Sequence, residues 1–150
     1  INLNKIMKEL HKTFLSLNLD YDKYFSVFFG IYNKDSHVFK YVNAGHNSVP
    51  ILISGKDIKK LMLKGYPIAN IFDNVDYIVE KVTLKVGDKI LLYTDGITET
   101  TNSEGVQFGV DRLINTIISD GNILENIKSS VNNFSIVHKD DYAVLLAEII

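Results

Sequence analysis

The stretch ILLYTDGITETTNSEGVQFG, residues 90–109, decides the fold. Four apolar or aromatic residues, 90–93, run directly into Thr94-Asp95-Gly96, and a polar segment follows as far as Phe108-Gly109. A short continuous apolar run of this kind predicts a strand over 89–94 that is buried on both faces. The strand therefore ends on a carboxylate, Asp95, and the end of a strand is a rigid place to hold a charged ligand.

The size and charge of the chain narrow the classes of protein it belongs to. Its 150 residues, 46% hydrophobic and 23% charged, are typical of one globular domain, and we expect a single domain over 1–150. The net charge of -2 and the scattered lysines argue against a nucleic-acid partner. No apolar run approaches the roughly 20 residues that span a bilayer, so we expect no membrane segment here and a cytoplasmic protein.

Apolar spacing predicts the other elements. A helical period covers 3–17, with Asn2 or Asn4 as its cap, and alternating patterns then predict strands over 24–32, 37–43, 49–53, 58–63 and 75–84. After Phe108 the helical period returns over 110–118 and again over 124–134, and an apolar strand over 142–150 closes the chain. A helix, a run of antiparallel strands, two helices and a last strand indicate an α+β layered fold.

Carboxylates stand at the boundaries of two predicted strands. Asp95 ends one strand, and Asp140-Asp141 directly precede the last one. If the two strands are neighbours, Asp95 and one of the later pair converge, and clustered carboxylates repel unless a cation neutralises them. The chain has no cysteine and only four histidines, so the matching ions are Mg²⁺ or Mn²⁺. Thr-Asp-Gly is equally a turn sequence, and Asp140-Asp141 equally a charged strand entry, so both interpretations stay open.

The histidines and glutamates carry weaker signals. In the sequence Ala44-Gly45-His46-Asn47 we expect a tight chain reversal, with His46 bonded to the backbone in a structural role. No motif of a serine hydrolase or of a nucleotide-binding loop is present. The remaining candidates are expected to be solvent-exposed: His11, His37, His138, Glu99 and Glu104.

Five motifs in a fixed order resemble a known family. They are YVNAGHN (41–47), GYPI (65–68), VGDKILLYTDGITE (86–99), NSEGVQFGVDRL (102–113) and DDYAVLL (140–146). The series resembles the bacterial SpoIIE/RsbU-type serine/threonine phosphatases, a branch of the metal-dependent PPM superfamily, over nearly the whole chain.

The resemblance implies an α-β-β-α sandwich of two antiparallel sheets flanked by helices. It implies hydrolysis of phosphoserine or phosphothreonine in signal transduction, commonly on STAS-type anti-sigma-factor antagonists, with an upstream sensor domain and a site for two Mn²⁺ or Mg²⁺ ions. Asp95 matches the metal-binding aspartate of the family's T-D-G, and Asp140 matches the one that precedes the last strand, with Asp141 the less favoured ligand. Gly45, His46 and Gly96 match motif positions that we expect to be structural, and no catalytic residue is expected beyond the metal ligands.

The chain also departs from the family pattern. The G-D-x-x-D and G-D-V-S-G-H-G motifs, which carry the metal-bridging ligands, have no counterpart, and the sequence enters a helical pattern directly at Ile1. We therefore expect the first strands of the domain to be missing, the metal site to be incomplete and this fragment to be inactive alone. Uncovered sheet edges would favour pairing with another chain, including a second copy. The alternative is a non-catalytic phosphatase-fold module that binds a partner or forms oligomers.

Overall fold

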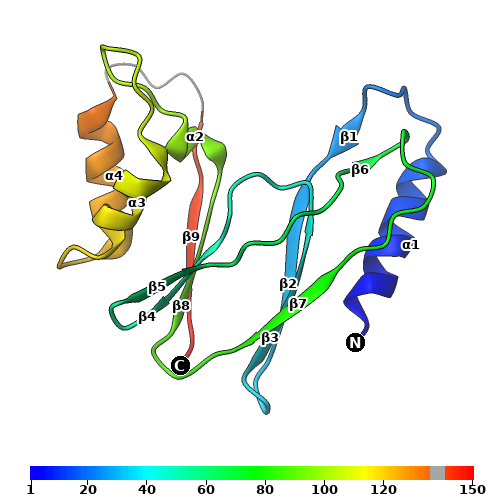
Figure 1. Cartoon of the computed structure of the whole chain (residues 1–150), viewed down its shortest axis with the longest axis horizontal. Helices are drawn as coiled ribbons and strands as arrows, with labels where there is room; N and C mark the ends of the chain where they lie inside the picture. Colours follow the sequence, from blue (N-terminus) through cyan, green and yellow to red (C-terminus); the bar gives the residue numbers. More distant parts are fainter. Residues whose placement is uncertain (136–140) are drawn as a thin grey trace. The chain divides into compact units, whose positions relative to one another are not determined.

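The computed structural model describes residues 1–135 and 141–150, and it forms two compact units (Figure 1). The first unit comprises residues 1–49 and 62–85, and the second comprises residues 50–61 and 86–150. The predictions made for His138 and Asp140 lie outside the described residues.

The first unit is built on a three-stranded antiparallel sheet. Its strand order is β2 (Val27–Asn33), β3 (Val38–Ala44) and β7 (Val79–Thr83). A second, two-stranded sheet pairs β1 (Tyr24–Phe25) with β6 (Ile68–Ala69). The predicted single strand over 24–32 is therefore wrong in one respect: it breaks at Ser26, because its first two residues pair with β6 and the following ones pair with β3.

Helix α1 (Leu3–Leu15) packs on this unit through a stripe that includes a histidine. Leu3, Met7 and His11 are its buried residues. Leu3 and Met7 belong to the core that includes Val42 and Tyr77. The expectation that His11 is exposed is wrong, since only 3% of this residue is accessible. Burial is tolerated because both ring nitrogens have partners: Nδ1 lies 2.7 Å from the Tyr77 hydroxyl and Nε2 lies 3.2 Å from the Ala69 carbonyl oxygen.

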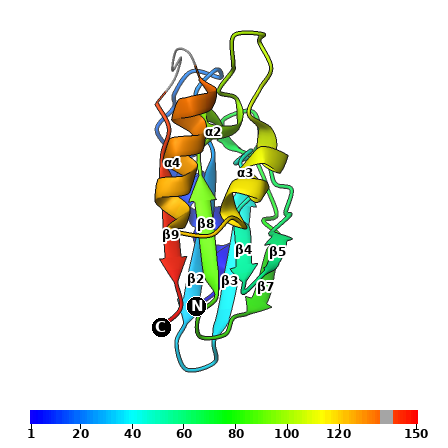
Figure 2. The same ribbon diagram turned by 90° about the vertical axis from the view of Figure 1, so that its left-hand side faces the viewer.

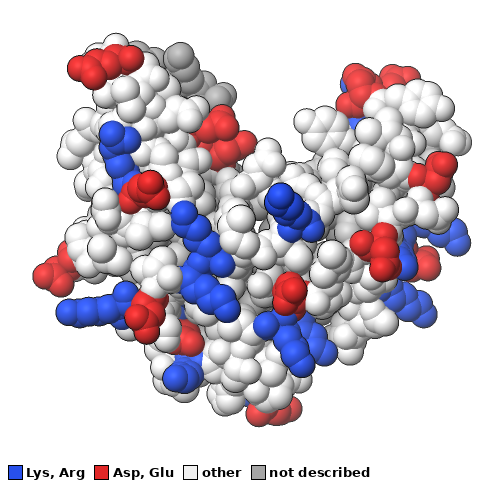
Figure 3. All heavy atoms as spheres, viewed as in Figure 1, with Lys and Arg blue, Asp and Glu red and all other residues white. Residues whose placement is uncertain are grey.

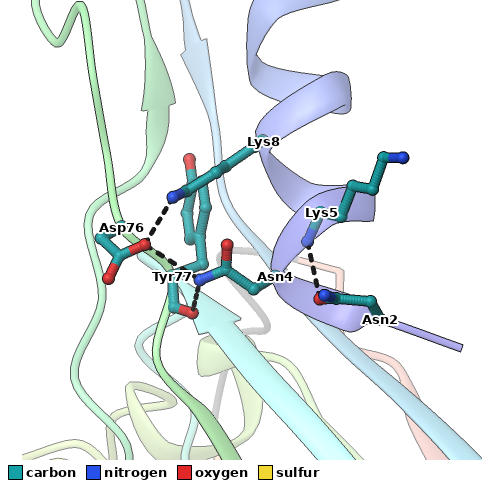
Figure 4. A network of polar contacts seen from close by, with 6 residues as sticks. All are labelled: Asn2, Asn4, Lys5, Lys8, Asp76 and Tyr77. Atoms are coloured by element: carbon teal, nitrogen blue, oxygen red, sulfur yellow. Dashed lines mark hydrogen bonds and ion pairs between the residues drawn. The ribbon is translucent and has the colours of Figure 1, made fainter.

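Polar contacts fix the start of α1 to the segment that precedes β7 (Figure 4). Asn2 is the cap, and its side chain accepts a 3.0 Å bond from the Lys5 N–H. Asn4 instead donates its amide to the Asp76 carboxylate (3.1 Å) and to the Tyr77 carbonyl (2.6 Å). Lys8 Nζ lies 2.6 Å from the same Asp76 oxygen, and the hydrogen bonds from Lys8 and Asn4 hold the pKa of Asp76 below its usual value.

The second unit holds a four-stranded antiparallel sheet in the order β5 (Asp57–Lys60), β4 (Ile51–Ser54), β8 (Lys89–Tyr93) and β9 (Val144–Glu148). Helices α3 (Gly109–Ile117) and α4 (Ile123–Phe134) cover one face of it, as Figures 1 and 2 show. That face and the helices share one core, whose buried members are Ile51, Ile53, Leu91, Tyr93, Ile97, Phe108, Leu113, Ile117, Ile127 and Val131.

The register of the sheet places the opening stretch at its centre. Leu91 of β8 pairs with Ile51 of β4 on one side and with Leu146 of β9 on the other. The sequence left open whether the closing strand lies beside residues 89–94, and the pairing of β8 with β9 shows that it does. The segment after Tyr93 differs from the expected loop, because a four-residue helix, α2 (Asp95–Thr98), follows the strand at once.

The element order and the antiparallel pairing confirm the α+β class. In the described residues no helix combines the length and the apolar character that a bilayer crossing requires. On the face drawn in Figure 3, acidic and basic side chains are interspersed rather than gathered by sign.

Candidate metal centre

The ends of β8 and β9 are joined beyond the last paired residues. The Thr94 N–H donates to the Ala143 carbonyl (3.0 Å), and the Ala143 N–H donates to the Thr94 hydroxyl oxygen (3.0 Å). Thr94 is the N-cap residue of α2, but its hydroxyl serves the neighbouring strand instead of the helix. The Thr94-Asp95-Gly96 and Asp141-Tyr142-Ala143 segments therefore lie side by side at one end of the sheet.

Gly96 is required by the closeness of this approach. A Cβ at position 96 would lie 2.6 Å from the Asp141 carbonyl oxygen and 3.2 Å from the Tyr142 Cβ. The first distance is shorter than non-bonded atoms allow, so any side chain would push the two segments apart. The glycine after Asp95 is thus explained by packing, and it sets how near the Asp141 backbone comes to the start of α2.

Asp95 combines a fixed backbone with an available carboxylate. It is the first residue of α2, and its carbonyl accepts bonds from the Glu99 N–H (2.8 Å) and the Thr98 hydroxyl (3.2 Å). Its side chain is exposed, and among the described residues its carboxylate takes part in no hydrogen bond or ion pair. Carboxylate oxygens are the ligands that Mg²⁺ and Mn²⁺ prefer, so Asp95 suits a cation in kind and in accessibility.

Of the aspartates expected to share a metal ion with Asp95, the described residues include one. Asp141 is exposed at the same end of the sheet, while Asp140 lies outside the described residues. Within 1–135 and 141–150 no group of three or more histidine, aspartate or glutamate side chains is placed to hold a metal ion. The described residues therefore fit one edge of a cation site, and a complete ligand shell is not formed by them alone.

The polar segment after α2 is an ordered hairpin. The Phe108 N–H donates to the Thr100 carbonyl (2.7 Å), and Thr101 bridges to Gln107. The Asn102 side chain accepts from the backbone N–H groups of residues 104 and 106, at 3.1 and 2.9 Å. Glu99 and Glu104 are exposed, as expected. The organising role of Asn102 was not anticipated, although an asparagine three residues before a glycine is a turn signal.

The A-G-H-N segment lies in the other unit and forms the expected chain reversal. Gly45 has φ of +75°, and a Cβ there would lie 2.8 Å from Pro67. The expected bond of His46 to other backbone groups is not found among the described residues. The Asn43 side chain holds the His46 backbone instead: Asn43 Oδ1 accepts from the His46 N–H (2.8 Å), and Asn43 Nδ2 donates to the His46 carbonyl (2.9 Å). Asn43 is the organising residue that the sequence did not reveal.

Comparison with known proteins is decisive at the family level. The family profile described as Stage II sporulation protein E (SpoIIE) matches residues 1–150. The chain belongs to the SpoIIE family. It is 32% identical over 107 residues to the phosphoserine phosphatase RsbU of Bacillus subtilis, a match that covers 70% of this chain and 31% of RsbU. The chain spans less than a third of each of the two curated relatives that it matches.

Solved structures of low sequence identity share the fold of this SpoIIE-family chain. A structure of the PP2C phosphatase domain of SpoIIE from Bacillus subtilis, with a fragment of its regulatory domain, matches with a TM-score of 0.79 at 21% identity, over 99% of this chain and 44% of that one. The catalytic domain of the serine/threonine protein phosphatase PstP, solved with 2 manganese ions, matches with a TM-score of 0.61 at 9% identity, over 94% of this chain and 65% of that one. The α+β phosphatase fold expected from the family resemblance is confirmed, and the solved structures that share it are PP2C-type phosphatase domains.

Proposed function

We propose that this chain is part of a metal-dependent protein serine/threonine phosphatase, with Asp95 and Asp140 as metal ligands and Asp141 as the less favoured ligand. The observation that carries the proposal is the contact between the Thr94-Asp95-Gly96 segment and residues 141–143, which brings the two acidic segments to one end of the sheet. Membership of the SpoIIE family, the name of RsbU and the manganese ions of PstP support the same activity and cofactor.

The role of each residue follows from its position. A bound Mn²⁺ or Mg²⁺ would neutralise charge on a phosphoryl group and acidify water. Asp95 would present its carboxylate from a rigid strand end, while Thr94 keeps the neighbouring strand in register and Gly96 lets the Asp141 backbone approach. The chemistry proposed is direct attack of water on the phosphorus, without a covalent intermediate, as the family resemblance implies.

The substrate belongs to the proposal as well. We expect a phosphoserine or phosphothreonine protein, with a STAS-type anti-sigma-factor antagonist as the first candidate, because the family resemblance implies that class. A regulatory domain in the same protein is expected on the same ground, and the SpoIIE structure includes part of one. We propose a cytoplasmic location for the same reason, because the proposed substrate is a bacterial signalling protein.

The decisive experiment measures metal binding and turnover separately on the 150-residue chain. Mn²⁺ should broaden the backbone NMR signals of Asp95, Gly96 and Asp141, and Asp95→Asn should remove that broadening. Asp111→Asn is the matched control, because Asp111 is another exposed aspartate in the first turn of a helix of the same unit. Broadening that Asp95→Asn leaves unchanged would refute the assignment of Asp95.

Turnover of p-nitrophenyl phosphate decides whether these residues suffice. We infer that the chain alone is close to inactive, because one or two carboxylates hold hard divalent ions weakly and the described residues form no larger group. Vigorous Mn²⁺-dependent turnover that Asp95→Asn abolishes would overturn that inference while supporting the phosphatase assignment.

The small number of metal-ligating side chains grouped in the described residues also favours a second candidate. This is a non-catalytic phosphatase-fold module that binds a partner or associates with itself. The two candidates differ in their response to added Mn²⁺. A module of this second kind would bind a phosphorylated STAS protein, or a second copy of the chain, equally well with and without the metal and with Asp95→Asn.

A further inference from the structure

A hollow of about 430 Å³ lies in the first unit, between the A-G-H-N segment and residues 62–65. This volume falls within the range of about 300–1,000 Å³ that is usual for ligand sites. The residues that line it include His46, Asn47, Met62 and Lys64, and all of its lining belongs to the one unit. Nothing in the proposed phosphatase chemistry uses these residues.

The walls of the hollow are locked together by Asn43, which is 9% exposed. Its Nδ2 donates to the His46 carbonyl (2.9 Å) on one wall and to the Leu63 carbonyl (2.7 Å) on the other. Gly65 completes the junction, because a Cβ there would lie 1.8 Å from the Asn43 carbonyl oxygen. The hollow is therefore preorganised, and a ligand would not have to order either wall.

Alongside the apolar side chains of Val49, Met62 and Leu63, the lining holds three groups that suit an anion. Lys64 contributes an ammonium group, Asn47 an amide and His46 a ring N–H, and all three are donors. Among the described residues, no aspartate or glutamate lines the hollow. In the described part of the chain, the side chains of His46, Asn47 and Lys64 form no hydrogen bond or ion pair, whereas Lys8, Lys23 and Lys89 pair with carboxylates. The donors are thus available to a ligand.

We propose that this hollow binds a phosphate-type oxyanion through Lys64, His46 and Asn47. The assignment of the ligand rests on the proposed function, which supplies two sources of such a group: the phosphoseryl side chain of a protein substrate and the inorganic phosphate released from it. The charge-assisted bond from Lys64 should dominate, because hydrogen bonds that involve an ionised donor are the stronger ones.

The test is an NMR titration of the metal-free 150-residue chain with inorganic phosphate and, separately, with a phosphoserine peptide and its unphosphorylated form. We expect saturable shifts of the backbone signals of residues 46, 47, 64 and 65. Lys64→Gln should weaken binding roughly tenfold, and His46→Gln should weaken it less. Lys56→Gln is the control, since Lys56 is an exposed lysine of the β4–β5 turn in the other unit.

Each outcome has a fixed meaning. Tighter binding of the phosphoserine peptide than of phosphate identifies the substrate as the ligand, and the reverse order identifies the released product. The proposed site is refuted if the shifts do not saturate. It is also refuted if Lys64→Gln and Lys56→Gln reduce the shifts equally. Equal binding of sulfate shows an adventitious ion only. The measurement uses no metal and should be unaffected by Asp95→Asn. The proposal of an anion site and the proposal of phosphatase activity can therefore be refuted separately.

Discussion

His11 and Tyr77 are 66 positions apart in the sequence, yet the imidazole Nδ1 lies 2.7 Å from the phenol oxygen inside the first unit. Nε2 lies 3.2 Å from the Ala69 carbonyl, to which it donates, and Nδ1 shares a hydrogen bond with the Tyr77 hydroxyl. Both residues are at most 3% exposed, and burial raises the pKa of Tyr77 to about 12. The helix and the segment before β7 are thus joined by a buried polar contact in which both ring nitrogens have partners.

Tyr77→Phe should lower the free energy of unfolding by about 1–3 kcal/mol, because it leaves a buried imidazole nitrogen without a partner. Urea denaturation monitored by circular dichroism measures the change. Tyr32→Phe is the matched control: its hydroxyl also lies near a histidine nitrogen, at 2.8 Å from His37 Nδ1, but this contact is exposed. Equal losses in the two variants would contradict the importance of burial.

The contacts of Asp76 predict an order of pKa changes. The hydrogen bond from Lys8 is the largest cause of its lowered pKa and the bond from Asn4 the next, so Lys8→Met should raise the pKa more than Asn4→Ala does. Since the folded pKa lies below the usual 3.8, the stabilisation is present above about pH 4 and is lost as the pH falls through the folded pKa. Carboxyl NMR titration checks both statements. Lys12→Met, on the same helix, should leave the Asp76 pKa unchanged.

Gly96→Ala should destabilise the second unit, although alanine in place of glycine within a helix ordinarily stabilises by about 0.5–1 kcal/mol. The added Cβ would meet the Asp141 carbonyl oxygen at 2.6 Å, and forced displacement of this kind costs about 1–3 kcal/mol. Thermal unfolding gives the sign directly. A rise in Tm would show that the two segments are not held together as described.

Arg112 ties the start of α3 to the end of α4. Its Nη1 donates to the carbonyls of Gln107 and Phe108, each at 2.9 Å, and its guanidinium lies 4.9 Å from the centre of the Phe134 ring. Arg112→Lys should reduce stability by about 1 kcal/mol, because an ammonium group cannot stack on the ring as a planar guanidinium does. Lys128→Met, an exposed cation of α4, should change stability by less than about 0.5 kcal/mol, and a comparable loss there would refute a specific role for Arg112.

The sequence predicted the order of the main elements, because long apolar runs and helical periods are strong signals, but it left open whether β8 and β9 are neighbours. It did not predict His11 as a core residue, since an imidazole within an apolar stripe counts as polar until its partners are known. The four residues of α2 and the two of β6 are shorter than any window in which a period can be detected.

The sequence also predicted part of the candidate site. Asp95, Asp140 and Asp141 were singled out by their positions at strand boundaries, but the meeting of the two segments depended on a strand pairing that the sequence left open. The need for glycine at position 96 was not, because the approach of one backbone to another leaves no pattern of side chains. Asn43 escaped notice for a related reason: its partners, the backbone groups of His46 and Leu63, carry no sequence signal.

The chain passes between the two units after Val49, after Leu61 and after Lys85. During translation, synthesis of the second unit begins before the first unit is complete, because β4 and β5 of the second unit lie between β3 and β7 of the first in the sequence. During synthesis, β4 must therefore wait for β8, its partner on the interior side of the sheet, until residues 62–85 have emerged. A single protease cut at any of the three crossings would leave the two units covalently connected through the others, so limited proteolysis should nick this domain without dividing it.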